Sequence, residues 1–145
     1  MFKRRNEGFT LVELLIVLAV IAALLAIVTP VAVNAVRRAK ATQVASTLRN
    51  IAAAVQQYYY TEEKMATSVA SLRSAKYIQG KVDDYKLSSA TNTISAPATT
   101  DTVAYVIYDV AITDPNQRNS MQNVWSEIGF ANNKPYVKVE VSRYW

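Results

Sequence analysis

The pattern of hydrophobic and polar positions divides the chain into two very different parts. Positions 9 to 28 form a run of apolar residues with a single charge, Glu13. A helix of that length, at about 1.5 Å per residue, spans the roughly 30 Å hydrocarbon core of a bilayer. A secretory signal peptide cleaved near Ala23 or Ala26 is the competing interpretation, but its apolar core is usually only about 7–15 residues long. The pattern therefore favours a membrane anchor.

Helical periodicity continues beyond the apolar run. Residues 31–60 contain no glycine or proline. Apolar side chains recur there at steps of three and four, on one helical face, at Val44, Leu48, Ile51, Val55 and Tyr58. Pro30 lacks an N–H and clashes with the Ala26 carbonyl, so it predicts either a kink or the end of the helix. The periodic pattern that resumes beyond it favours a kink. We expect one long helix from Phe9 to about Tyr60, with its second half packed on a small domain.

Alternation of apolar and polar residues predicts strands in the second half of the chain. The clearest are 103–112 and 136–144, and 85–89 is a shorter one. A short helix is expected within 66–80, with Thr67 or Ser68 as N-cap and Gly80 just past its end. Residues 88–102 suit a loop or the edge of a hairpin, and residues 114–130 form either a long loop or a short helix around Met121 to Trp125. The predicted class is α+β: a long N-terminal helix, half membrane-embedded, packed by its C-terminal half on a small antiparallel sheet.

The amino-acid composition limits the kinds of catalytic and metal-binding sites that the chain can form. The chain has no cysteine and no histidine, which removes disulfides, thiolate metal sites and the commonest general base. We find no Gly-rich phosphate loop, nucleophile elbow or paired catalytic carboxylates. Asp101, Asp109 and Asp114 are too scattered for a calcium loop. We therefore expect no catalytic residue, no cofactor and no metal site.

The net charge of +5 is unevenly placed. Residues 1–8 sum to +2, Glu13 adds −1, and the helical stretch 37–49 sums to +4, whereas residues 61–145 carry nine basic and nine acidic residues. A neutral C-terminal part is a poor electrostatic footprint for nucleic acid. Lys134, Lys138 and Arg143 are the residues that could still form a local basic patch.

Glu13 is the unusual feature of the apolar run, since an acid at the centre of a membrane span costs about 2.5–3.5 kcal/mol on insertion scales. It is either an interfacial acid without a role or a charge kept for a partner to neutralise. A basic leader, Gly8, Phe9, the acid four residues later and Pro30 occur together in GFTLVELLIVLAVIAALLAIVTP, residues 8–30. This stretch resembles the type IV pilin and pseudopilin family, with its class III prepilin-like N-terminus and GFTLVE motif.

The resemblance implies a defined processing and assembly route. A prepilin peptidase would cut between Gly8 and Phe9 on the cytoplasmic side and methylate the new amino group of Phe9. Glycine at the cleavage position lets the backbone approach the peptidase closely. Glu13 would then pair with the terminal amine of a neighbouring subunit. In assembled pili of this family the helix near Pro30 is often locally unwound.

The resemblance also implies a division of the chain and a function. Residues 1–8 would be the leader, 9–30 the transmembrane and filament-core helix, 31–60 its amphipathic continuation and 61–145 the globular head. The precursor would sit in the inner membrane with its head outside the cytoplasm. It would polymerise with itself, minor pilins and the assembly machinery into a cell-surface or periplasmic filament for adhesion or twitching motility. The alternatives are a type II secretion pseudopilin, a DNA-uptake pilin and a membrane-tethered enzyme or binding domain.

Overall fold

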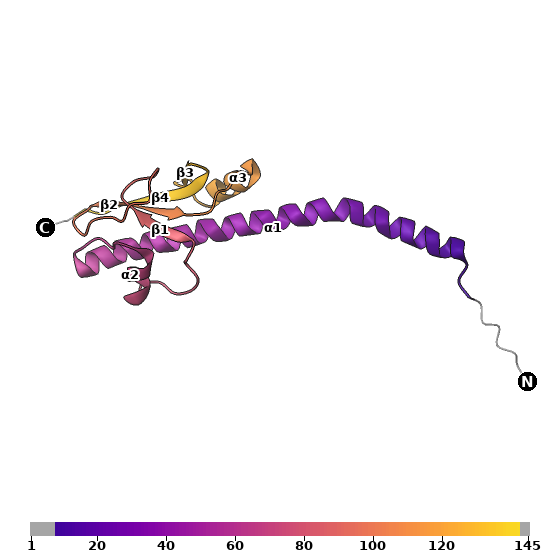
Figure 1. The fold of residues 1–145 in the computed structure, drawn as a ribbon, viewed down its shortest axis with the longest axis horizontal. Helices are drawn as coiled ribbons and strands as arrows, with labels where there is room; N and C mark the ends of the chain where they lie inside the picture. The colour runs from indigo at the N-terminus through magenta and orange to yellow at the C-terminus, as the bar shows by residue number, and fades with distance from the viewer. Residues whose placement is uncertain (1–7, 143–145) are drawn as a thin grey trace, which may run out of the picture. The chain divides into compact units, whose positions relative to one another are not determined.

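A computed structural model describes residues 8–142 of the chain, and its fold is drawn in Figure 1. The elements follow the order α1, α2, β1, β2, α3, β3 and β4. The chain divides into two compact units between Arg37 and Arg38. The first unit contains the apolar part of α1, and the second contains the rest of α1 and all other elements.

Helix α1 is a single helix of 52 residues, Leu11–Glu62. Its length follows from the sequence, because Pro30 is the only helix-breaking residue between its ends. In the second unit α1 buries one face, made of Ala41, Ala45, Leu48, Ile51, Ala52, Ala54, Val55, Tyr58 and Tyr59. The predicted apolar stripe is thus confirmed, except that Val44 at its start is only partly buried. Tyr60 is the exposed member of the three adjacent tyrosines.

The head contains one antiparallel sheet of four strands in the order β1-β2-β4-β3. The strands are Tyr85–Ser88, Val103–Tyr108, Gly129–Ala131 and Lys134–Glu140 for β1 to β4. Its inner face supplies Leu87, Ala104, Val106, Val137 and Val139, which share one core with the buried face of α1. The α+β fold, a long N-terminal helix packed on a small antiparallel sheet, is therefore as predicted, and Figure 1 shows the sheet lying along α1.

The strand expected over 103–112 is too long. Strand β2 ends at Tyr108, and Val110 is exposed. The Asp109 N–H still donates to the Asp84 carbonyl at 2.7 Å, which continues the β1–β2 register by one pair beyond Tyr85 and Tyr108. The Asp109 carboxylate lies 2.6 Å from the ammonium of Lys134, the first residue of β4. Both partners are distant in sequence, so alternation alone could not place this end.

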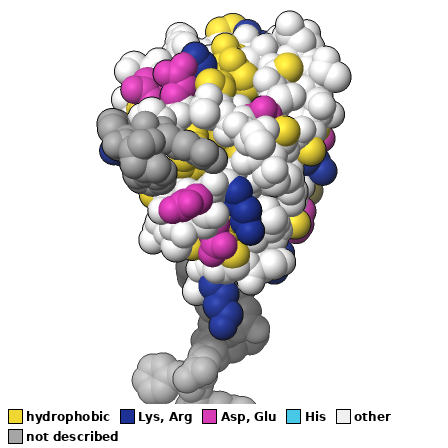
Figure 2. Space-filling model, turned by 90° about the vertical axis from the view of Figure 1, so that its left-hand side faces the viewer, with side chains coloured by type: hydrophobic (Ala, Val, Ile, Leu, Met, Phe, Trp, Pro, Cys, Tyr) yellow, Lys and Arg dark blue, Asp and Glu magenta, His cyan; other side chains and the backbone are white. Residues whose placement is uncertain are grey.

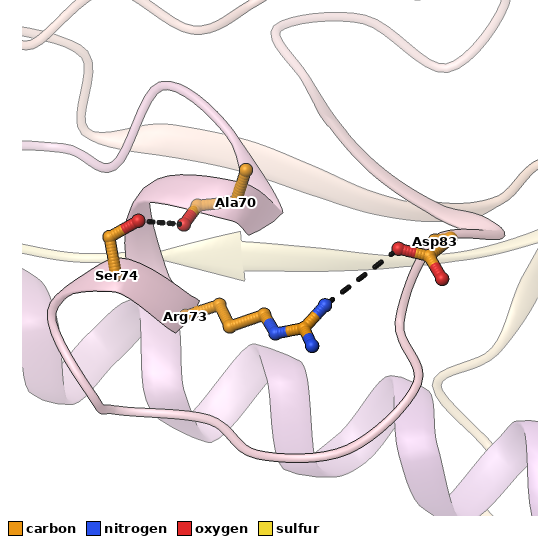
Figure 3. Close-up of polar contacts among 4 residues, drawn as sticks. All are labelled: Ala70, Arg73, Ser74 and Asp83. Atoms are coloured by element: carbon orange, nitrogen blue, oxygen red, sulfur yellow. Dashed lines mark hydrogen bonds and ion pairs between the residues drawn. The ribbon is translucent and has the colours of Figure 1, made fainter.

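The short helix α2, Val69–Ser74, begins where it was predicted. Ser68 is the N-cap, and its hydroxyl accepts from the Ser71 N–H at 3.1 Å. The predicted end at Gly80 is wrong, because the helix stops at Ser74 and Lys76 already has a positive φ of 63°. Figure 3 shows Arg73 of α2 reaching toward Asp83, at 3.9 Å, and the Ser74 hydroxyl bonded to the Ala70 carbonyl.

Helix α3, Pro115–Val124, resolves the choice left open for 114–130 in favour of a helix. It starts earlier than expected because Asp114 caps it, accepting from the Asn116 N–H at 2.9 Å, and Pro115 occupies its first turn. Strand β3 follows and was not predicted. A tight turn with positive φ at Asn132 and Asn133 connects β3 to β4.

Arg118 of α3 holds these connections together. Its Nε donates to the Ile112 carbonyl at 2.8 Å, and its Nη2 donates to the Asn133 side chain. The guanidinium also lies 5.2 Å from the centre of the Phe130 ring. In a chain without cysteine, one side chain thus ties the segment after β2, helix α3 and the β3–β4 turn to each other.

Candidate functional site

The start of α1 is fixed by a reciprocal pair of contacts between Thr10 and Glu13. The backbone N–H of Thr10 donates to the Glu13 carboxylate oxygen Oε2 at 2.8 Å, and the Thr10 hydroxyl donates to the same oxygen at 2.8 Å. In return, the Glu13 N–H donates to the Thr10 hydroxyl oxygen at 3.3 Å. Leu14 N–H donates to the Thr10 carbonyl, which makes Thr10 the N-cap and Glu13 the third helical residue. This is a capping box, T-x-x-E.

The capping box gives Glu13 a role within its own chain. Its carboxylate satisfies a backbone donor that the helix leaves without a partner, and it sits at the end of the helix dipole that favours negative charge. From the sequence, Glu13 was expected to be either an interfacial acid without a role or a charge for a partner subunit, and Thr10 was not singled out. The signal was present, since T-x-x-E immediately before an apolar run is the signature of such a cap.

Gly8 and Phe9 precede this cap. A side chain built on Gly8 would meet no atom within 4 Å. Gly8 is not one of the residues with positive φ. Among the described residues, therefore, neither packing nor backbone conformation requires glycine at this position. Phe9 is 89% exposed. The rest of the predicted leader, residues 1–7, lies outside the described residues.

The apolar part of α1 is exposed on every side. The exposed large hydrophobic residues are Phe9, Leu11, Val12, Leu14, Leu15, Ile16, Val17, Leu18, Val20, Ile21, Leu24, Leu25, Ile27, Val28, Val31, Val33 and Val36. Among the described residues, α1 is the one helix long and apolar enough to cross a membrane, by length and composition. A helix that is hydrophobic all round must be covered by lipid or by other protein.

Pro30 lies inside α1, and the helix is continuous on both sides of it. Its missing N–H leaves the Ala26 carbonyl without its usual helical donor. Beside it, the Thr29 hydroxyl donates to the Leu25 carbonyl at 2.7 Å. The kink at Pro30 stays a prediction.

The lysines that could have formed a basic patch on the head are paired with acids. Lys134 is bound to Asp109 at 2.6 Å, and Lys138 forms an ion pair with Glu140. The hydrogen bond that the Lys138 ammonium donates to the Glu140 carboxylate raises the pKa of Lys138. Arg143 lies outside the described residues. On the face shown in Figure 2, acidic and basic side chains are interspersed rather than segregated. Such a surface does not favour binding of a polyanion such as nucleic acid.

The scattered acids of the head are not brought together. Within residues 8–142 there is no group of three or more Asp or Glu side chains placed to hold a metal ion.

A cavity of about 490 Å³ lies between α2, β1 and the loop that contains Ile94. Its lining includes Arg73 and Asp83, the exposed ion pair seen in Figure 3.

Comparison with known families gives one match. Residues 3–29 match the family described as the prokaryotic N-terminal methylation motif. The chain thus carries the class III prepilin-like leader of type IV pilins and pseudopilins. The resemblance of the N-terminal segment to this family, noted from the sequence, is confirmed. The motif supports a pilin-like, exported protein and a membrane-anchored precursor, and the family it defines is structural. No curated protein and no solved structure matches the chain.

Proposed function

We propose that this protein is the structural subunit of a type IV pilus or a related filament, such as a secretion pseudopilus, and not an enzyme. The observation that carries the proposal is the combination of the methylation motif with one carboxylate, Glu13, at the start of an exposed apolar helix. Such a helix is stored in lipid as a monomer and covered by copies of itself in a filament.

The processing step follows from the same segment. A prepilin peptidase removes residues 1–8 by cutting between Gly8 and Phe9, and the new amine of Phe9 is methylated. Support comes from Gly8, where a side chain would meet none of the described residues within 4 Å, so that its bare backbone is open to close approach by a peptidase. Cleavage also places a cation beside the capping box.

Assembly then depends on the charge of Glu13. Its carboxylate pairs with the terminal amine of a neighbouring subunit inside the apolar core of the filament. An unpaired charge in such surroundings is strongly unfavourable, and breaking a buried pair by removing one partner costs about 3–5 kcal/mol. The pair would therefore favour one register among the many that an apolar helix allows.

Residues 9–30 would form the filament core, 31–60 its continuation and 61–145 the outer head. The paired lysines of the head give no specific support for a DNA-uptake pilin. The alternative from a different functional class is a membrane-tethered binding domain, which would not assemble into a filament.

The test is assembly of Glu13→Gln in a host that provides prepilin peptidase and the assembly machinery. Glutamine keeps an oxygen that accepts from Thr10 but lacks the charge. We expect normal leader removal and at least about a tenfold loss of sheared filament, since tenfold corresponds to about 1.4 kcal/mol. Lys81→Gln, a single charge change on the head, is the control and should assemble normally. Equal filament yields for Glu13→Gln and the control would refute the assembly role.

A further inference from the structure

A pair of cations lies where the apolar part of α1 ends. The last exposed large hydrophobic residue of that part is Val36. Arg37, which already has an interaction partner, comes next, and the exposed Arg38 and Lys40 follow. From Phe9 to Val36 a continuous helix would measure about 42 Å at 1.5 Å per residue. A bilayer with its headgroup layers is about 40–45 Å thick. A helix that starts at one surface therefore presents these cations at the opposite one.

The pair is not matched by acids on its own helix. Between Glu13 and Glu62 the sequence of α1 contains no Asp or Glu. Helix neighbours three or four positions away, the usual source of compensating charge, are therefore never acidic here. The cationic groups of Arg38 and Lys40 suit an anionic partner outside the helix.

The arrangement around the helix axis indicates what kind of partner this is. Successive residues are about 100° apart around an α-helix, so Arg38 and Lys40 point about 200° apart, to nearly opposite sides. Along the axis they differ by only about 3 Å. A neighbouring protein contacts one side of a helix, whereas a membrane surface surrounds it at one height. Long cationic side chains also reach readily to the interface.

We propose that Arg38 and Lys40 bind the phosphate groups of anionic phospholipids at the outer surface of the membrane that stores the subunit. The inference rests on the proposed membrane-stored precursor and adds a lipid partner to it. In this arrangement the pair sets the depth of the helix and holds the base of the head at the headgroup layer before assembly.

The experiment uses the full, uncleaved chain in lipid vesicles. Because the chain has no cysteine, Asn34→Cys gives a unique site for a fluorophore, one helical turn before Arg38. Quenching by brominated phosphatidylglycerol is compared with quenching by brominated phosphatidylcholine at equal mole fractions. The ratio reports which lipid is enriched next to the helix.

We expect roughly a fivefold preference for phosphatidylglycerol, which weakens as salt is added. In Arg38→Gln/Lys40→Gln, which leaves Arg37 in place, most of this preference should be lost. Lys81→Gln/Lys86→Gln removes two charges from exposed residues of the head and should keep the preference. An unchanged preference in the first double variant overturns the proposal, as does an equal loss in the second. The first outcome would leave the pair available for acidic groups of a neighbouring subunit.

The vesicles contain neither peptidase nor assembly machinery. A negative result here therefore leaves leader removal and filament formation untouched, while failure of the proposed function would appear as an unprocessed N-terminus in cells.

Discussion

Thr10 and Glu13 cap helix α1 reciprocally, each accepting a hydrogen bond from the backbone N–H of the other. The carboxylate that the proposed function assigns to a neighbouring subunit is thus already oriented toward the start of its own helix. In this arrangement Thr10 is a positioning residue, because it acts through Glu13.

Replacing Thr10 by alanine should loosen the first turn of α1. The change removes the hydroxyl that bonds both the carboxylate and the N–H of Glu13, and loss of an N-cap typically costs about 0.5–2 kcal/mol. The N–H groups of Glu13 and Leu14 bond to the Thr10 hydroxyl and carbonyl, so amide hydrogen exchange at residues 13 and 14 in detergent micelles should become faster. Thr10→Ser should restore protection, and Thr29→Ala, which removes a mid-helix hydroxyl, should not affect these amides. Unchanged exchange in Thr10→Ala would show that the cap does not form.

The stability of the head should depend on the face that α1 buries. Val55 is fully buried, whereas Val124 at the end of α3 is 38% exposed. Val55→Ala removes two methylene-sized groups and should cost at least about 1.6 kcal/mol at about 0.8 each, before any cavity term. Val124→Ala, the same chemical change, should stay within about 0.5 kcal/mol. Urea unfolding of the full chain in micelles, followed by near-ultraviolet circular dichroism, compares them, and equal losses would contradict the described packing.

Arg118 should stabilise the head more than an ordinary surface arginine. Its replacement by alanine removes a bond to the Ile112 carbonyl and the contact with the Phe130 ring, and hydrogen bonds from charged groups contribute about 1.5–3 kcal/mol. Arg73→Ala breaks only the exposed 3.9 Å pair with Asp83, which should contribute about 0–1 kcal/mol. Limited proteolysis should cut the 109–133 region faster in Arg118→Ala alone. Equal cutting of both variants would contradict the stabilising role of the Arg118 contacts.

Alkaline pH should destabilise the head through Tyr85. Burial raises the pKa of its phenol, while a hydrogen bond with Thr47 acts in the opposite direction. As pH passes the unfolded pKa near 10, the unfolded phenol ionises and the folded one stays neutral. The free energy of unfolding is therefore fully retained below that pH and falls as pH rises toward the folded pKa. Tyr85→Phe should give a shallower fall between pH 9 and 11; the same slope in both proteins would contradict this.

Much of this architecture is readable from the sequence because its signals are local. The apolar run and the stripe Leu48, Ile51, Val55 specify a long helix with one buried face, and alternation locates most of β4. The end of β2 was not predictable, because it depends on where its neighbours β1 and β4 begin, at Tyr85 and Lys134, and only the folded chain brings these segments together. Strand β3 has three residues, too few for a period to appear.

Two helix N-caps could have been predicted from the sequence but were not. Asp114 followed by Pro115 is a typical helix start, and it explains why α3 begins before Met121. Thr10 three positions before Glu13 specifies the cap at the site itself. What no pattern within one chain contains is the partner of the exposed apolar helix, since that partner is another molecule.

The N-terminus and intact mass of the protein from a sheared cell-surface fraction test the central claim most directly. The account predicts a chain that begins at Phe9 and carries one methyl group on its amine. A chain that retains Met1, or one cleaved after Ala23 or Ala26, would contradict it, because Glu13 would then have no new amine to pair with.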